Sequence, residues 1–128
     1  MALRVLNIVE TAYRGTLEEQ DDTILWATTA MRGGGADIDV LLRANAVNYG
    51  VKGQDASGLR FGYDEQTQPP HLEDDVKRLI DKGAKVYIVA DDVAERGLEG
   101  TDLVEGLERI SRSGIAALCA GYDQVWHW

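Results

Sequence analysis

Cysteine, histidine and proline are all scarce in this chain of 128 residues, which has one cysteine, two histidines and two prolines. The single thiol, Cys119, excludes a disulfide within the chain and a zinc site built from several cysteines. No second cysteine or histidine lies at the spacing of a metal-ligand pair, so we expect no metal site. Residues 1–6 lead directly into an apolar run without the layout of a signal peptide, and we expect a cytoplasmic protein.

Long apolar runs and positive charge are also lacking. No apolar run approaches the roughly 18 residues that a membrane span requires, so a transmembrane protein is excluded. The chain carries 13 Lys and Arg against 22 Asp and Glu, a formal net charge of −9, and both halves of the chain are acidic. Neither half therefore offers the basic face that nucleic-acid phosphates or anionic lipids require. Small molecules or other proteins remain as partners.

The chain does have the composition of an ordinary globular protein, with 45% hydrophobic and 27% charged residues. Its length suits one domain, which we place at residues 1–128. β-Forming or alternating runs predict strands, and periodic apolar residues between them predict helices. The predicted strands are 3–9, 38–42, 84–90 and 125–128, and the predicted helices are 16–33 and 72–83, with a short helical turn at 45–49.

Three further segments are harder to assign. The pattern Asp102-Leu103-Val104-Glu105 fits a capping box and predicts a helix start, while residues 107–110 fit either a continuation of that helix or a short strand. Ser111 or Ser113 is expected to cap a last helix that runs through Cys119. Residues 53–70 show no sustained period. A loop of that length either closes over a ligand or a neighbouring subunit, or is disordered.

Strands that alternate with helices predict an α/β fold with a mostly parallel sheet. Ligands of such sheets bind beyond the carboxyl ends of the strands, which here are residues 10–15, 43–54 and 91–97. Basic side chains of these segments could gather to bind an anion. The acidic ones could hold a cation or act as a general base, or else cap a helix and form a solvated face. The candidate ligand-binding residues are Tyr13, Arg14, Asn45, Asn48, Lys52, Gln54, Val89, Asp91, Asp92 and Arg96.

Glycines near Lys52 do not have the spacing of a phosphate-binding loop, and Gly33-Gly34-Gly35 joins a helix to a strand rather than a strand to a helix. We therefore expect no bound cofactor. Tyr122, Trp126 and Trp128 near the end of the chain are candidates for a subunit interface, because aromatic residues are enriched there. Packing inside the chain explains them equally well.

Several stretches together resemble the DsrE/DsrF-like family, and most closely its small YchN-like branch. The best of them are residues 46–54 (AVNYGVKGQ), 86–89 (VYIV), 94–98 (AERGL) and 123–128 (DQVWHW). The resemblance covers essentially the whole chain. It implies a three-layer α/β/α fold, flavodoxin-like or Rossmann-like, with about five strands, and a homotrimer or homohexamer.

Members of that family with known roles pass sulfane sulfur through a cysteine persulfide in sulfur metabolism or tRNA thiolation. The resemblance places this cysteine eight residues before Gly97, at Val89, and a second cysteine of some members at Asp92. Neither side chain can carry sulfane sulfur, since persulfide transfer needs a thiolate. We expect a binding or scaffold member of a sulfur relay without catalytic function, with sulfur-carrier proteins or a small molecule as partners.

Two alternatives stay open. One is a small-molecule- or anion-binding protein, or an enzyme of another class, that uses the residues at the strand ends. The other is a sulfurtransferase acting through Cys119. The simpler interpretation of Cys119 is a small apolar position among the alanines of the last helix.

Overall fold

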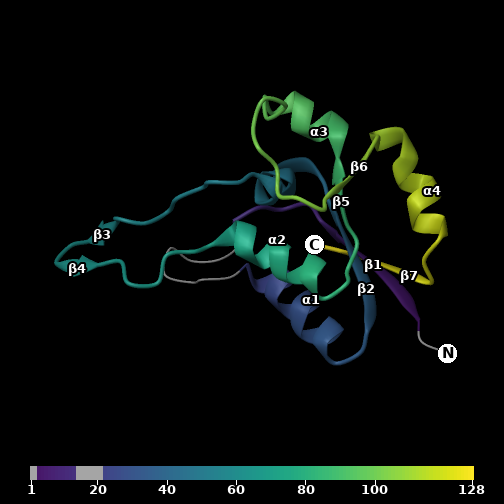
Figure 1. Ribbon diagram of the computed structural model, residues 1–128, viewed down its shortest axis with the longest axis horizontal. Coiled ribbons are helices and arrows are strands. Elements are labelled where there is room, and N and C mark those ends of the chain that lie inside the picture. Colours follow the sequence, from purple (N-terminus) through teal and green to yellow (C-terminus); the bar gives the residue numbers. More distant parts are fainter. Residues whose placement is uncertain (1–2, 14–21) are drawn as a thin grey trace.

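The structure is a computed structural model that describes residues 3–13 and 22–128. Five strands form one sheet in the order β6-β5-β2-β1-β7, and all four pairings between neighbours are parallel. The predicted α/β fold with a parallel sheet is confirmed (Figure 1). The strands of this sheet are β1 (Arg4–Val9), β2 (Asp37–Leu42), β5 (Val86–Val89), β6 (Glu108–Ile110) and β7 (Gln124–His127).

Helices cover both faces of the sheet, as right-handed connections require. The chain moves in one direction from β1 through β2 and β5 to β6, which puts α1 and α2 on the same face. It then returns across the whole sheet to β7, and this return puts α4 on the opposite face. The helices are α1 (Thr23–Gly33), α2 (Leu72–Asp81), α3 (Ala90–Glu95) and α4 (Ile115–Ala120), with 3₁₀ turns η1 (Ala44–Gly50) and η2 (Arg112–Gly114).

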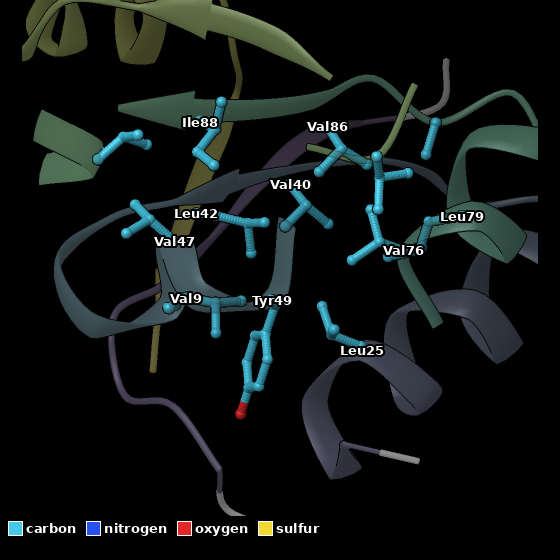
Figure 2. Packing of buried hydrophobic residues seen from close by; sticks show 14 residues of the cluster. Val9, Leu25, Val40, Leu42, Val47, Tyr49, Val76, Leu79, Val86 and Ile88 are labelled. Atoms are coloured by element: carbon cyan, nitrogen blue, oxygen red, sulfur yellow. The ribbon is translucent and has the colours of Figure 1, made fainter. Parts of the chain in front are cut away.

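Alternation along the strands builds a separate apolar cluster on each face. The cluster under α1 and α2 contains Val9 and Leu42 of the central strands together with Leu25, Tyr49 and Leu79, all fully buried (Figure 2). The cluster under α4 is smaller, and its buried members are Leu6, Ile8, Leu41 and Val89. No helix in the described residues is long and apolar enough to cross a membrane.

The start of the first helix differs from the sequence expectation. α1 begins at Thr23, where the side chain of Asp22 accepts hydrogen bonds from the N–H groups of Ile24 and Leu25. The capping box expected at residues 16–19 lies outside the described residues. Gly34 ends α1, as predicted.

The helix expected from Asp102 was wrong. Residues 102–104 instead run alongside residues 50–52, since Lys52 donates a backbone hydrogen bond to Asp102 and Val104 donates one to Gly50. Gly106 has a φ of 94°, which a right-handed helix cannot accommodate. The alternative of a short strand is confirmed by β6. No serine caps α4 with its side chain, because the hydroxyls of Ser111 and Ser113 bond each other at 3.0 Å.

Residues 53–70 contain a hairpin that the sequence did not indicate. Its strands β3 (Arg60–Phe61) and β4 (Asp64–Glu65) have two residues each, too few to show any period. Figure 1 shows the hairpin projecting far from the sheet, and Tyr63 at its turn is fully exposed.

Candidate functional site

The candidate site lies where the connections of two neighbouring strands diverge. After β5 the chain enters α3, whose Val93 packs into the cluster under α1 and α2. After β6 the chain turns to α4, whose Ile115 and Leu118 pack on the opposite face. Ligands of open α/β sheets bind at such a divergence, outside the carboxyl ends of the strands.

A buried carboxylate, Asp92, ties this edge of the sheet together. Its Oδ2 accepts a hydrogen bond from the backbone N–H of Ala44 at 2.7 Å, and its Oδ1 accepts one from the guanidinium of Arg112. Arg112 also contacts Glu95 at 2.8 Å, and its backbone N–H donates to Asp91 at 2.8 Å. The ends of β2, β5 and β6 are therefore held by one carboxylate and one arginine.

The electrostatics of this cluster stabilise the charged forms of Asp92 and Arg112. Burial by itself would raise the pKa of Asp92, but the bonds from Ala44 and Arg112, with the charges of Arg112 and Arg96, outweigh burial and lower that pKa. The bonds to Asp92 and Glu95 raise the pKa of Arg112. Asp92 is thus a fixed anion whose two oxygens are already occupied.

Five of the candidate residues form a second part of the site, a chain of side-chain hydrogen bonds along η1. Arg96 Nε donates to Asn45 Oδ1 at 3.0 Å, and Asn48 Nδ2 donates to the Asn45 carbonyl at 2.9 Å. Gln54 Nε2 donates to the Asn48 carbonyl at 2.6 Å, and the Tyr13 hydroxyl donates to Gln54 Oε1 at 2.6 Å. Arg96 also reaches the Asp92 carbonyl at 3.5 Å, which links the two parts.

Tyr49, which the sequence reading did not select, positions Tyr13. Its hydroxyl donates to Asp22 Oδ2 at 2.6 Å and accepts the backbone N–H of Tyr13, so it contacts both the end of β1 and the start of α1. The two tyrosine rings meet edge to face, with centroids 5.6 Å apart. Tyr13 has a φ of 59°, and burial raises the pKa of its hydroxyl. Nothing in the sequence indicated this role, which follows from the full burial of Tyr49 in an otherwise apolar cluster (Figure 2).

The structure does not bring the remaining candidates to these contacts. Lys52 pairs with Glu105 at 3.7 Å. Val89 is fully buried in the cluster under α4. Arg14 lies outside the described residues. The anion site expected from Arg14, Lys52 and Arg96 therefore has no support in the described contacts.

Cys119 and the aromatic residues near it lie elsewhere. α4 runs from the carboxyl end of β6 back to the amino end of β7, so Cys119, near the end of α4, lies at the opposite edge of the sheet. There Tyr122 donates to the buried carboxylate of Asp39, and the guanidinium of Arg4 lies 4.7 Å from the centre of the Tyr122 ring. Tyr122 thus packs within the chain, whereas Trp128 is 48% exposed and Trp126 is partly buried.

A third group of side chains at the carboxyl edge also escaped the sequence reading. Glu10, Arg43 and His127 come from neighbouring strands β1, β2 and β7. Glu10 is 2.7 Å from His127 Nε2 and 3.8 Å from Arg43 Nε. Taking the first polar residue at the end of each strand would have found them. In residues 3–13 and 22–128, no group of three His, Cys, Asp or Glu side chains is arranged to hold a metal ion.

The crystal structure of the YchN protein from E. coli superimposes with a TM-score of 0.74, at 18% identity, over 98% of this chain and 99% of that one. A protein of unknown function, MTH1491 from Methanobacterium thermoautotrophicum, superimposes with a TM-score of 0.61, at 17% identity, over 97% and 98%.

The likeness is one of fold. At these identities it establishes the architecture over the whole chain and not the activity. No protein-family model matches the sequence, and no curated protein matches it either.

Proposed function

We propose that this chain is a cytoplasmic, self-associating member of a DsrE-like sulfur relay that binds a partner or ligand without carrying sulfur itself. The YchN-like fold supports a sulfur-related role. One observation carries the non-catalytic part of the proposal: Val89, at the position where the resemblance puts the sulfur-carrying cysteine, is fully buried in an apolar cluster.

The chemistry of the neighbouring groups agrees with this proposal. A sulfane-sulfur carrier must present a thiolate that can attack the donor and then release sulfur to an acceptor. Asp92, at the position of the second cysteine, has no sulfur atom, and both of its oxygens accept hydrogen bonds. Neither of these two positions therefore offers an atom that could carry sulfane sulfur.

Cys119 supplies the chain's one thiol, but it packs against the cluster under α4 at the other edge of the sheet. Transfer through Cys119 would need a second site near Arg4 and Tyr122, separate from the strand-end residues.

Persulfide labelling tests the proposal. The full chain is incubated with a sulfane-sulfur donor, and persulfide is detected by mass spectrometry in the wild type, in Cys119→Ser, and in Cys119→Ser combined with Ala116→Cys. The last variant is the matched control, because it puts one thiol on the exposed side of the same helix. We expect no persulfide on the wild type. Persulfide on the wild type but not on Cys119→Ser would instead support transfer through Cys119.

Self-association is tested separately by native mass spectrometry. A homotrimer or homohexamer is the expected state, as the resemblance implies. A monomer at all working concentrations would contradict this part of the proposal and leave the labelling result unaffected.

A further inference from the structure

Glu10, Arg43 and His127 project from the same face of the sheet at its carboxyl edge. The strands continue past their ends here, because Arg43 donates a backbone hydrogen bond to Val9 and Glu10 donates one to Trp128. Side chains therefore keep alternating between faces. Glu10 and Arg43 each follow by two residues a member of the cluster under α4, and His127 is the partner of Ile8 across β1 and β7. All three lie on the α4 face, above that cluster.

The hydrogen bonds of this group are incomplete at Arg43. Glu10 Oε2 is 2.7 Å from His127 Nε2, a hydrogen-bond distance, but Glu10 Oε1 is 3.8 Å from Arg43 Nε, which is too long for one. Arg43 Nε is buried and has no hydrogen-bond partner in the described residues. A guanidinium has five N–H donors, and a buried donor without an acceptor is unusual enough to need an explanation.

We propose that Arg43, beside Glu10 and His127, forms a binding site for a small oxyanion, such as a phosphate or sulfate group. The planar fork of a guanidinium matches two oxygens of an oxyanion and gives each a charge-assisted hydrogen bond. His127 Nε2 is 2.7 Å from Glu10 Oε2, so this ring holds the carboxylate beside Arg43. Glu10 offsets part of the positive charge of the guanidinium, so removal of the Glu10 charge should leave more of that charge for the anion.

The inference does not depend on the sulfur-relay role, since it rests on Arg43 and its neighbours alone. It also differs from the earlier expectation, in which Arg14, Lys52 and Arg96 bound the anion. The Nε of Arg96 donates to Asn45 Oδ1, whereas the Nε of Arg43 has no hydrogen-bond partner in the described residues.

The simplest competing explanation makes Arg43 only a counterion of Glu10. The variant Glu10→Gln distinguishes the oxyanion site from this counterion explanation. If the site binds an oxyanion, removal of the Glu10 charge removes a repulsion and tightens binding. If Arg43 is only the counterion of Glu10, neither the wild type nor Glu10→Gln binds the oxyanion.

The test is a titration of the full ¹⁵N-labelled chain with inorganic phosphate at constant ionic strength, followed by NMR at the Arg43 Nε–H and the His127 ring. Arg43→Met should weaken binding at least about tenfold, and Glu10→Gln should tighten it about threefold. Arg43→Lys keeps the charge, removes the fork, and should also weaken binding. Arg109→Gln removes one positive charge at an exposed position of β6 and should leave the affinity unchanged.

Absence of a saturable shift in both the wild type and Glu10→Gln would overturn the proposal. Equal weakening by Arg109→Gln and the Arg43 variants would also overturn it, because the binding would then follow overall charge. If Arg43→Met does not fold, Arg43→Lys and Glu10→Gln still decide the question.

Discussion

Replacement of Asp92 by alanine is expected to destabilise the protein by about 2–3 kcal/mol, because the carboxylate is buried and holds three strand ends together. The main loss is the 2.7 Å bond from the Ala44 N–H, since a hydrogen bond to a charged group contributes roughly 1.5–3 kcal/mol. Alanine leaves that amide without its partner. We add nothing to this free energy for the bond to Arg112, because solvent screens the charge of that partly exposed guanidinium.

Urea denaturation at neutral pH measures this loss, with two comparison variants. Asp92→Asn keeps the shape and one acceptor, so it should cost less than Asp92→Ala. Asp91→Ala removes a carboxylate that, among the described residues, accepts only the backbone N–H of Arg112, so it should destabilise the protein less than either Asp92 variant. A stability of Asp92→Ala within about 0.5 kcal/mol of the wild type would refute the reasoning, because it is the size of an ordinary surface substitution.

The same carboxylate gives a prediction about pH. The pKa of Asp92 is lower in the folded chain than its usual value. Its contribution is therefore present above the pKa of an unfolded aspartate and is lost as the pH falls through the folded pKa. The stability difference between the wild type and Asp92→Ala should shrink as the pH drops below about 4. A difference that stays constant down to acid unfolding would show that the carboxylate charge is not responsible.

Three further predictions concern aromatic side chains. Tyr49→Phe keeps the buried ring but removes the bond to Asp22, and should cost about 1–2 kcal/mol by urea denaturation; an unchanged midpoint would contradict this role. Burial, followed by the bond to Asp39, raises the pKa of Tyr122, so wild-type stability should fall as the pH rises above about 10. Tyr122→Phe should remove that alkaline loss, and a persistent loss would point to another group. Trp128→Ala should shift native mass spectra toward smaller assemblies if the exposed ring lies in a subunit interface, whereas unchanged spectra would exclude that role.

The sequence was a good guide to architecture because the sheet is parallel and covered on both faces. The run at residues 84–90 could be assigned from its apolar character, and α2 from its period and the glycine at its end. β6 could be given only as one of two alternatives, and the hairpin strands could not be predicted at all, since two or three residues carry no period. The helix predicted to start at Asp102 was wrong, because the pairing of this segment with residues 50–52 outweighs a local capping signal.

The candidate site was predicted in location but only partly in composition. Parallel strands place their carboxyl ends together, so Asn45, Gln54 and Arg96 could be grouped from the topology alone. Arg112 could not, because it follows β6, a strand that the sequence left ambiguous. Tyr49 could not either, since its hydroxyl contacts the site from a ring that packs in the core.

Whether the wild-type chain accepts sulfane sulfur tests the proposed binding role most directly. Mass spectrometry of the wild type after exposure to a sulfane-sulfur donor should show the unmodified mass. The chain's one thiol, Cys119, packs against an apolar cluster away from the carboxyl ends of the strands. Gain of the mass of a sulfur atom on the wild type, and its loss in Cys119→Ser, would contradict a binding role without sulfur transfer.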